Sequence, residues 1–280
     1  MISPALPGEG IWTASVAPAS PRDAVPLIAK AYFRPDPARP YAIATILRFD
    51  LRYVALHMVA GTSEPGGAVG MLGTGSIPAV DQRPGMLLAA FNGGFKYADG
   101  AYGMMVDRTI YVRPVAGAAT IAITSRGRVF MGVWGQDARL SVSNPKLVSW
   151  RQNGSLLIDH GVINPLVAND GAWGTTVLNH VNTWRSAIGI APHHVLLYAS
   201  GNALSVSTLA RALQKAGATR AMELDINPYW VRAFFYGRDP AGHLAMASLR
   251  PDMQGNGLDF LGPYARDFFY ITRIPGRSKP

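Results

Sequence analysis

Turn-forming residues break this chain into short segments from end to end. It carries 30 glycines and 21 prolines in 280 residues, while only 15% of its residues are charged. The segments between the breaks are rich in β-branched and aromatic residues, which favour strands. This pattern predicts an α+β fold dominated by a twisted antiparallel or mixed β-sheet, with many short strands, tight turns and few helices.

The expected domain organisation follows from the length and from the lack of a linker. A chain of 280 residues with 49% hydrophobic residues can bury a full core. No Pro/Ser/Gly-rich linker, charge block or solenoid-length repeat divides its middle. We expect a single domain over residues 41–280, preceded at residues 1–40 by an extended Pro-rich lead-in that packs on the domain through Trp12.

The charge balance favours an anionic partner. With 26 Lys and Arg against 17 Asp and Glu, the formal net charge is +9. The basic residues are scattered and form no run with interleaved aromatics, so we expect no nucleic-acid partner. Phosphate-bearing glycans or anionic cell surfaces suit such a diffuse positive charge. The lack of cysteine excludes disulfides and thiolate metal sites and leaves the redox compartment open.

Several segments carry clear local signals. Apolar residues recur at helical spacing over 205–216, with a serine available as the cap and Gly217 after the last turn. Strands are predicted over 41–49, 51–60 and 85–91. Turn residues predict antiparallel hairpins over 103–112, 119–133, 185–199 and 230–249.

The stretch 221–228 alternates apolar and polar residues and predicts a strand that Pro228 ends. Glu223, Asp225 and Asn227 would share its polar face. Carboxylates two residues apart on a strand start roughly 6 to 7 Å from each other, so their charges repel unless water, a cation or a substrate lies between them. A ligand site or an ordinary solvent-facing strand would both explain this pattern.

A glycine turn follows the strand predicted over 85–91. Asn92-Gly93-Gly94 would let the backbone turn sharply and would expose amide donors that could hold an anion, although a plain strand-ending turn explains the same residues. Histidines in predicted turns are more often solvated than functional. No metal site is expected at these histidines, which are His160, His193 and His194.

The order of these motifs resembles that of the phosphodiester glycosidase family. The resemblance spans about residues 85–236, and the order and spacing carry it more than any single motif. The motifs are Asn92-Gly93-Gly94, Gly103 with Asp107, the segment 156–161, Arg185-Ser-Ala-Ile-Gly189, the capped helix, and Glu223-Leu-Asp225.

The resemblance implies a division of roles. Arg185 and the amides of the glycine turn would neutralise a departing phosphate. Asp225 would stabilise a cationic sugar or act as nucleophile or base, and Glu223 would be its partner acid or bind sugar hydroxyls. The expected catalytic residues are Asp225, Glu223 and Arg185, and the expected substrate-binding residues are Asn92, Gly93, Gly94, Asp107, Asp159, Asn227 and Trp230.

The chain departs from the family pattern at two points. His160 interrupts an Asp-Gly turn, and Ile226-Asn227-Pro228 stands where the family continues into a glycine-rich run with serine. The altered turn offers a side-chain amide and a rigid kink in place of bare amides and a hydroxyl. We therefore expect a different substrate geometry from that of the family.

The function expected from the resemblance is hydrolysis of a sugar from a sugar-1-phosphodiester or a related envelope glycan, by a divergent bacterial member of the family. The alternative is a non-catalytic binder of anionic or phosphorylated glycans, and a nucleic-acid binder ranks last. No cofactor is required, and a divalent cation beside Glu223 and Asp225 is left open. A secreted or envelope-associated location is expected, although the chain shows no signal segment and no apolar run of transmembrane length.

Overall fold

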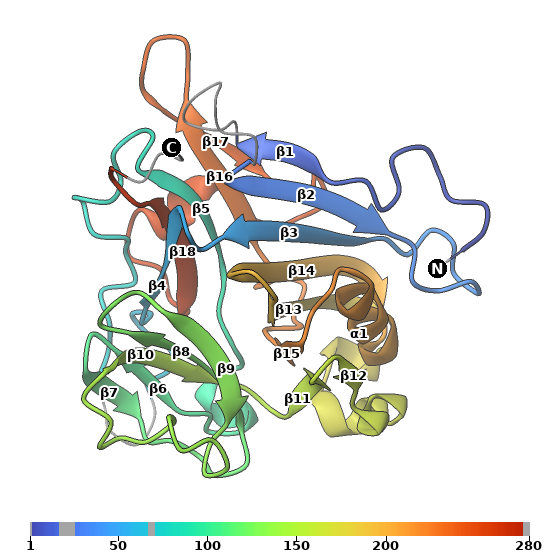
Figure 1. Cartoon of the computed structure of the whole chain (residues 1–280), viewed down its shortest axis with the longest axis horizontal. Helices are drawn as coiled ribbons and strands as arrows, with labels where there is room; N and C mark the ends of the chain where they lie inside the picture. Colours follow the sequence, from blue (N-terminus) through green and yellow to red (C-terminus); the bar gives the residue numbers. More distant parts are fainter. Residues whose placement is uncertain (1, 17–25, 67–70, 277–280) are drawn as a thin grey trace. The chain divides into compact units, whose positions relative to one another are not determined.

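The computed structural model describes residues 2–16, 26–66 and 71–276. Within these ranges the chain is mostly β-structure, with one α-helix and three sheets of antiparallel strands (Figure 1). The predicted dominance of antiparallel sheet with few helices is confirmed, although the chain is mostly β rather than an even mixture of helix and sheet. Among the described residues, no helix is long and apolar enough to span a bilayer.

The chain folds into two compact units, each made of separate stretches of sequence. The first unit holds residues 1–53, 156–228 and 276–280, and the second holds residues 54–155 and 229–275. The single domain expected over residues 41–280 would include parts of both units, and it stays a prediction.

An eight-stranded antiparallel sheet forms the first unit. The lead-in at residues 1–40 contributes its first two strands, and Trp12 packs partly buried against the core. In their order across the sheet, the strands are β1 (Thr13–Val16), β2 (Ile28–Phe33), β3 (Ala44–Asp50), β14 (Val195–Leu204), β13 (Thr183–Ala191), β15 (Arg220–Glu223), β11 (Leu156–Asp159) and β12 (Val162–Ile163).

The helix α1 (Val206–Lys215) packs against β13 and β14 (Figure 1). Its start has a capping box, because the Thr208 amide donates to Ser205 Oγ and the Ser205 amide donates to Thr208 Oγ1. Small side chains of the sheet, such as Ala187 and Ala199, share the core with its buried face and let the helix approach closely. The predicted helix is confirmed.

Three short 3₁₀ helices connect β12 to β13 in the first unit. Trp173 and Val167 are buried there and fasten the connection to the core. The 3₁₀ helices are η2 (Pro165–Ala168), η3 (Asp170–Trp173) and η4 (Val177–Asn179).

Two five-stranded antiparallel sheets form the second unit. One has the order β7 (Thr109–Val112), β6 (Met104–Val106), β10 (Leu147–Gln152), β8 (Ala119–Thr124) and β9 (Val129–Val133). The other has the order β17 (Leu244–Ser248), β16 (Ala233–Arg238), β5 (Leu87–Asn92), β18 (Phe268–Arg273) and β4 (Val54–Val59). The 3₁₀ helices of this unit are η1 (Tyr97–Asp99) and η5 (Gly257–Phe260).

The acidic strand predicted over 221–228 is shorter than expected. Its ladder ends in β15 at Glu223, and the carbonyl oxygen of Asp225 accepts a hydrogen bond from Ser186 Oγ at 2.7 Å. The polar side of this segment is also buried, since Glu223 is 2% exposed and Asp225 is 5% exposed. Both the regular alternation as far as Asn227 and the solvent-facing alternative are therefore wrong.

Candidate functional site

The predicted site residues are divided between the two units. Asp159, Arg185, Glu223, Asp225 and Asn227 belong to the first unit. The second unit contains Asn92, Gly93, Gly94, Asp107 and Trp230.

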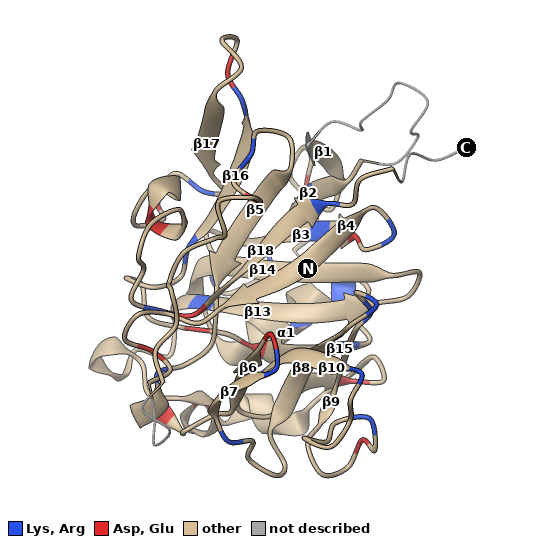
Figure 2. Cartoon of the chain, turned by 90° about the vertical axis from the view of Figure 1, so that its left-hand side faces the viewer, with Lys and Arg blue, Asp and Glu red and all other residues tan. Residues whose placement is uncertain are grey.

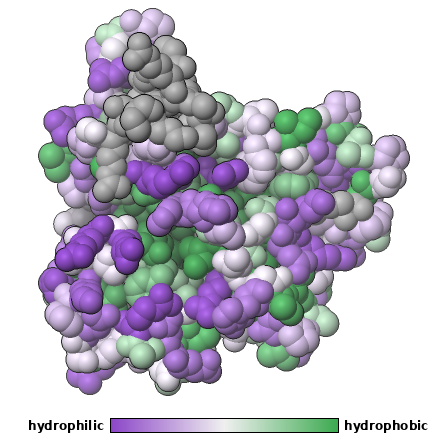
Figure 3. Space-filling model, viewed as in Figure 1, coloured by the Kyte–Doolittle hydropathy of each residue, from purple (hydrophilic) through white to green (hydrophobic). Residues whose placement is uncertain are grey.

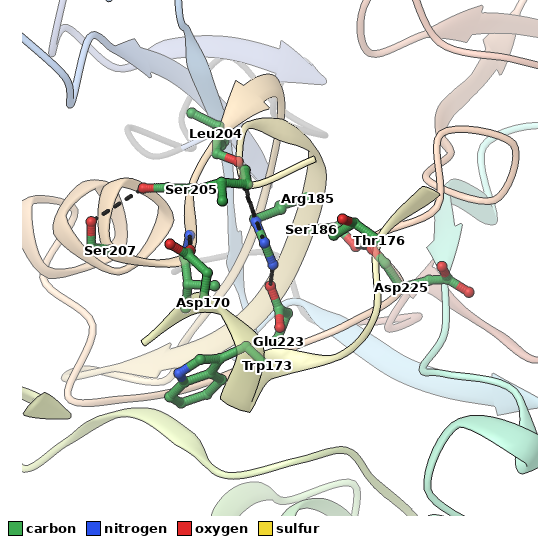
Figure 4. Close-up of polar contacts among 12 residues, drawn as sticks. Asp170, Trp173, Thr176, Arg185, Ser186, Leu204, Ser205, Ser207, Glu223 and Asp225 are labelled. Carbon is green, nitrogen blue, oxygen red and sulfur yellow. Dashed lines mark hydrogen bonds and ion pairs between the residues drawn. The ribbon is translucent and has the colours of Figure 1, made fainter. Parts of the chain in front are cut away.

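Arg185 and Glu223 form a buried ion pair in the first unit. Because Glu223 of β15 lies opposite Ala187 of β13, Arg185 lies diagonally across from it on the same face of the sheet. Arg185 Nη1 lies 2.7 Å from Glu223 Oε1. Figure 4 shows the two side chains pointing toward each other beside the start of α1.

Two backbone carbonyls hold the rest of the Arg185 guanidinium. Its Nε donates to the carbonyl oxygen of Leu204 at 3.2 Å, and its Nη2 donates to that of Val181 at 3.4 Å. The sequence analysis predicted that this guanidinium would neutralise a phosphate. In the structure it is engaged by one carboxylate and two carbonyls, so its geometry is that of a group that positions Glu223.

The carboxyl group of Glu223 has a strongly shifted pKa. Burial is the largest cause and raises the pKa from 4.5 to about 7, against the opposing effect of the Arg185 charge and hydrogen bond. The negative charges of Asp170 and Asp225 raise it further. A carboxyl group that titrates near neutrality can both give and accept a proton at physiological pH.

Asp225 lies two residues beyond the end of β15. One carboxylate oxygen, Oδ1, accepts the backbone N–H of Asn227 at 2.8 Å, which orders the turn that follows. In Figure 4 the Asp225 carboxylate points away from the pair formed by Arg185 and Glu223. The two acids therefore do not share the single strand face that the sequence predicted. Asp225 is nevertheless near enough for its charge to raise the pKa of Glu223.

Asp170 is a member of this site that the sequence analysis missed. It lies in η3, and its Oδ1 accepts the backbone N–H of Val206, the first residue of α1, at 3.4 Å. It therefore stands at the amino end of the helix, where negative charge is favoured. Asp170 precedes Val206 by 36 residues, so no local capping pattern connects it with the helix.

Asp159 lies at the opposite end of β15 from Glu223. It is half-exposed, forms an ion pair with Arg220 at 2.7 Å, and has its Oδ1 3.1 Å from His160 Nδ1. The ladder between β11 and β15 pairs Ile158 with Ala221, which leaves Asp159 beside the start of β15. The predicted role of Asp159 in substrate binding gains no support from this position.

In the second unit, the amides of the Asn-Gly-Gly turn already have acceptors. The Gly93 amide donates to the carbonyl oxygen of Asp267 at 3.0 Å, and the Gly94 amide donates to Asp267 Oδ2 at 3.2 Å. The expectation of exposed amide donors at these two glycines is therefore wrong. Their substrate-binding role stays untested.

Close packing explains why glycine occupies both positions. A Cβ on Gly93 would lie 2.0 Å from Asp267 Oδ2, and one on Gly94 would lie 2.9 Å from the Arg151 guanidinium carbon. Neither residue has a positive φ. Arg151 and Asp267 form a second buried ion pair, with Nε 2.9 Å from Oδ2. The turn is thus locked around this pair.

The remaining predicted residues of the second unit differ in exposure. Asp107 is exposed at the turn of the hairpin between β6 and β7, where its φ is 46°. Trp230 is half-buried against a core cluster. No group of three or more His, Asp or Glu side chains that could hold a metal occurs in the described part of the chain.

Comparisons with known proteins agree with the motif order. The profile of the phosphodiester glycosidase family matches residues 86–225, half of the chain. No curated protein sequence matches significantly. Among solved structures, the catalytic domain of zebrafish N-acetylglucosamine-1-phosphodiester alpha-N-acetylglucosaminidase, described as auto-inhibited by its pro-peptide, is similar over 95% of this chain and 88% of its own, with 16% identity and a TM-score of 0.51.

A second solved structure, described as a hypothetical protein from Synechocystis, is similar over 83% of this chain and 59% of its own. Its sequence identity is 14% and its TM-score is 0.48. At such identities the structural likeness concerns the fold alone, whereas the profile match concerns the sequence itself. The chain belongs to the phosphodiester glycosidase family.

Proposed function

We propose that the protein hydrolyses the glycosidic bond of a sugar-1-phosphodiester. Family membership supports the reaction class. One observation supports particular residues as catalytic. Arg185 and Glu223 form a buried pair in which the pKa of Glu223 is raised to about 7. A carboxyl group whose pKa lies near neutrality suits acid–base catalysis.

The bond to be broken sets the catalytic requirements. Departure of a phosphate monoester leaves positive charge on the sugar, which passes through an oxocarbenium-like transition state. Such a leaving group needs little protonation. The main requirements are therefore negative charge beside the sugar and a base that activates water.

In the proposed mechanism, Glu223 and Asp225 share these tasks. Glu223 exchanges a proton with the attacking water or with the leaving oxygen. Asp225 stabilises the cationic sugar or attacks it as a nucleophile, and its hydrogen bond from the Asn227 amide orients its carboxylate. Arg185 acts as a positioning residue, because it fixes one oxygen of Glu223 and lowers a pKa that burial alone would raise further.

We further propose that the substrate lies outside the cytoplasm, in a bacterial envelope glycan. The scattered positive charge suits an anionic polymer of this kind. In Figure 2 the blue and red residues are interspersed along the ribbon. This distribution favours a glycan over a nucleic acid as the partner.

The test is product release from a panel of sugar-1-phosphodiesters, with the parent protein compared with Glu223→Gln and Asp225→Asn. Release by the parent, with a loss of at least about a hundredfold in each variant, would support the assignment. Asp159→Asn is the matched control and should keep full activity. Full activity of the Asp225→Asn variant would overturn the role of Asp225. Glycan binding without release would instead support the non-catalytic alternative.

A further inference from the structure

Three basic side chains surround one indole ring in the second unit. The guanidinium carbon of Arg266 lies 5.1 Å from the centroid of Trp230, that of Arg232 lies 5.8 Å away, and Lys96 Nζ lies 5.9 Å away. Cations are attracted to the face of an indole, so the ring holds this group of charges together. None of the three cations was singled out by the sequence motifs.

Two of the three cations are fixed in position. Arg266 is 4% exposed, and its Nη2 donates to the carbonyl oxygen of Gly94 at 3.0 Å. The backbone N–H of Arg232 donates to Asn92 Oδ1 at 3.3 Å, while its guanidinium pairs with Asp259. These contacts connect the basic cluster directly to the Asn-Gly-Gly turn.

The electrostatics of the cluster favour an added anion. Three positive charges within 6 Å of one ring centroid repel one another, and the burial of Arg266 strengthens this repulsion. Asp259 pairs with Arg232, and Asp267 pairs with Arg151. An anion between the basic groups would lower the free energy of this arrangement.

Phosphate is the anion whose geometry fits these donors. A guanidinium presents planar N–H groups that match two phosphate oxygens, and a lysine adds a mobile point charge. We propose that Lys96, Arg232 and Arg266, gathered around Trp230, form a binding site for the phosphate group of a phosphate mono- or diester. The choice of phosphate among possible anions rests on the proposed function.

The groups that the sequence assigned to phosphate binding are engaged by other groups of the protein. Arg185 is engaged by Glu223, and the Gly93 and Gly94 amides are engaged by Asp267. The glycine turn also contacts the basic cluster. It presents the Gly94 carbonyl to Arg266 and places Lys96 two residues further along the chain.

Trp230 supplies a direct readout of binding. The full chain is titrated with inorganic phosphate at constant ionic strength, and its tryptophan fluorescence is followed, with calorimetry in parallel. A saturable signal is expected in the parent chain. In Trp230→Phe the fluorescence change should disappear while the calorimetric affinity stays within about threefold of the parent.

Variants of the cations test the site itself. Arg266→Gln should weaken phosphate binding at least about tenfold, and Lys96→Gln should weaken it about threefold to tenfold. Arg126→Gln, in the turn between β8 and β9, is the matched control and should bind as the parent does. Lys96 is partly exposed, so its variant keeps the test valid even if Arg266→Gln fails to fold.

The experiment separates this inference from the proposed function, because it measures binding without hydrolysis. Phosphate binding that depends on Lys96 and changes the fluorescence of Trp230 would support the site even in a chain that hydrolyses nothing. Equal binding by the parent and Lys96→Gln would overturn it. Replacement of phosphate by chloride with no loss of signal would also overturn it.

Discussion

Arg185 and Glu223 form an ion pair whose side chains are only 1% and 3% exposed, with Nη1 2.7 Å from Oε1. Removing one partner from such a pair leaves a buried charge without compensation. We therefore expect Arg185→Met to lower the free energy of unfolding by about 3 to 5 kcal/mol at pH 8. At pH 5 the loss should be smaller, because Glu223 is then protonated in the folded chain.

Urea denaturation at the two pH values measures this effect. The matched control is Arg220→Met, which breaks a pair whose acid, Asp159, is half-exposed. Pairs of this kind contribute about 1 kcal/mol or less. Equal losses in the two variants would mean that burial does not govern the pair of Arg185 and Glu223.

The raised pKa of Glu223 also predicts a dependence of stability on pH. Since this pKa is about 7 in the folded chain and 4.5 ordinarily, the folded chain binds the proton more tightly than the unfolded chain. The contribution of Glu223 to stability is then complete below pH 4.5 and is lost as the pH rises through 7. The free energy of unfolding of the parent minus that of Glu223→Gln should fall by about 3 kcal/mol over this interval. A difference that stays flat from pH 4 to pH 8 would contradict the raised pKa.

Asp170 is expected to tune this titration. Its negative charge raises the Glu223 pKa, so Asp170→Asn should lower that pKa and move the titration of Glu223 to lower pH. The asparagine retains an oxygen that can accept the Val206 amide, so the helix start should stay intact. NMR titration of ¹³C-labelled glutamate carboxyl groups measures the shift directly. Asp159→Asn, at the far end of β15, should leave the Glu223 pKa unchanged.

The sequence predicted those elements whose signals lie within a few residues. The hairpin over 185–199 formed because turn residues connect two strands of matching pattern. The helix after Ser205 formed because its cap and its apolar spacing are local, and Gly217, with a φ of 90°, follows it as expected. The hairpin and the helix could therefore be predicted from their own residues, without knowledge of the rest of the chain.

Contacts between segments that lie far apart in the sequence could not be predicted from local patterns. The acidic strand ends at Glu223, and the carbonyl oxygen of Asp225 accepts a hydrogen bond from Ser186, which lies 39 residues before Asp225. The pair of Arg151 and Asp267 spans 116 residues. The close approach of this pair accounts for glycine at positions 93 and 94. Asp170 was missed for the same reason.

The close packing of Gly93 leads to a fourth prediction. A Cβ at this position would lie 2.0 Å from Asp267 Oδ2 and 2.6 Å from its carbonyl oxygen, so the backbone would have to move. Gly93→Ala should lower the free energy of unfolding by about 3 kcal/mol, measured by urea denaturation. Gly237→Ala in β16 is the control, because its Cβ would meet nothing within 4 Å. Similar stability of the two variants would show that the turn is not held tightly around Asp267.

Leu178 combines an unfavourable backbone with an exposed apolar side chain. Its φ is 57° and its ψ is 22°, and the residue is 79% exposed. In Figure 3, hydrophobic side chains in green reach the surface at the lower right, where Figure 1 draws the yellow segment between β12 and β13. Leucine adopts the left-handed region at a cost, whereas asparagine tolerates it.

Leu178→Asn should therefore raise the free energy of unfolding by about 0.5 to 1 kcal/mol. Thermal or urea denaturation measures the gain. Val162→Asn is the comparison, because Val162 is also exposed but lies in β12 with an ordinary backbone, where asparagine is disfavoured. That variant should be neutral or less stable. A loss of stability in Leu178→Asn would mean that the leucine side chain contributes packing that outweighs its backbone strain.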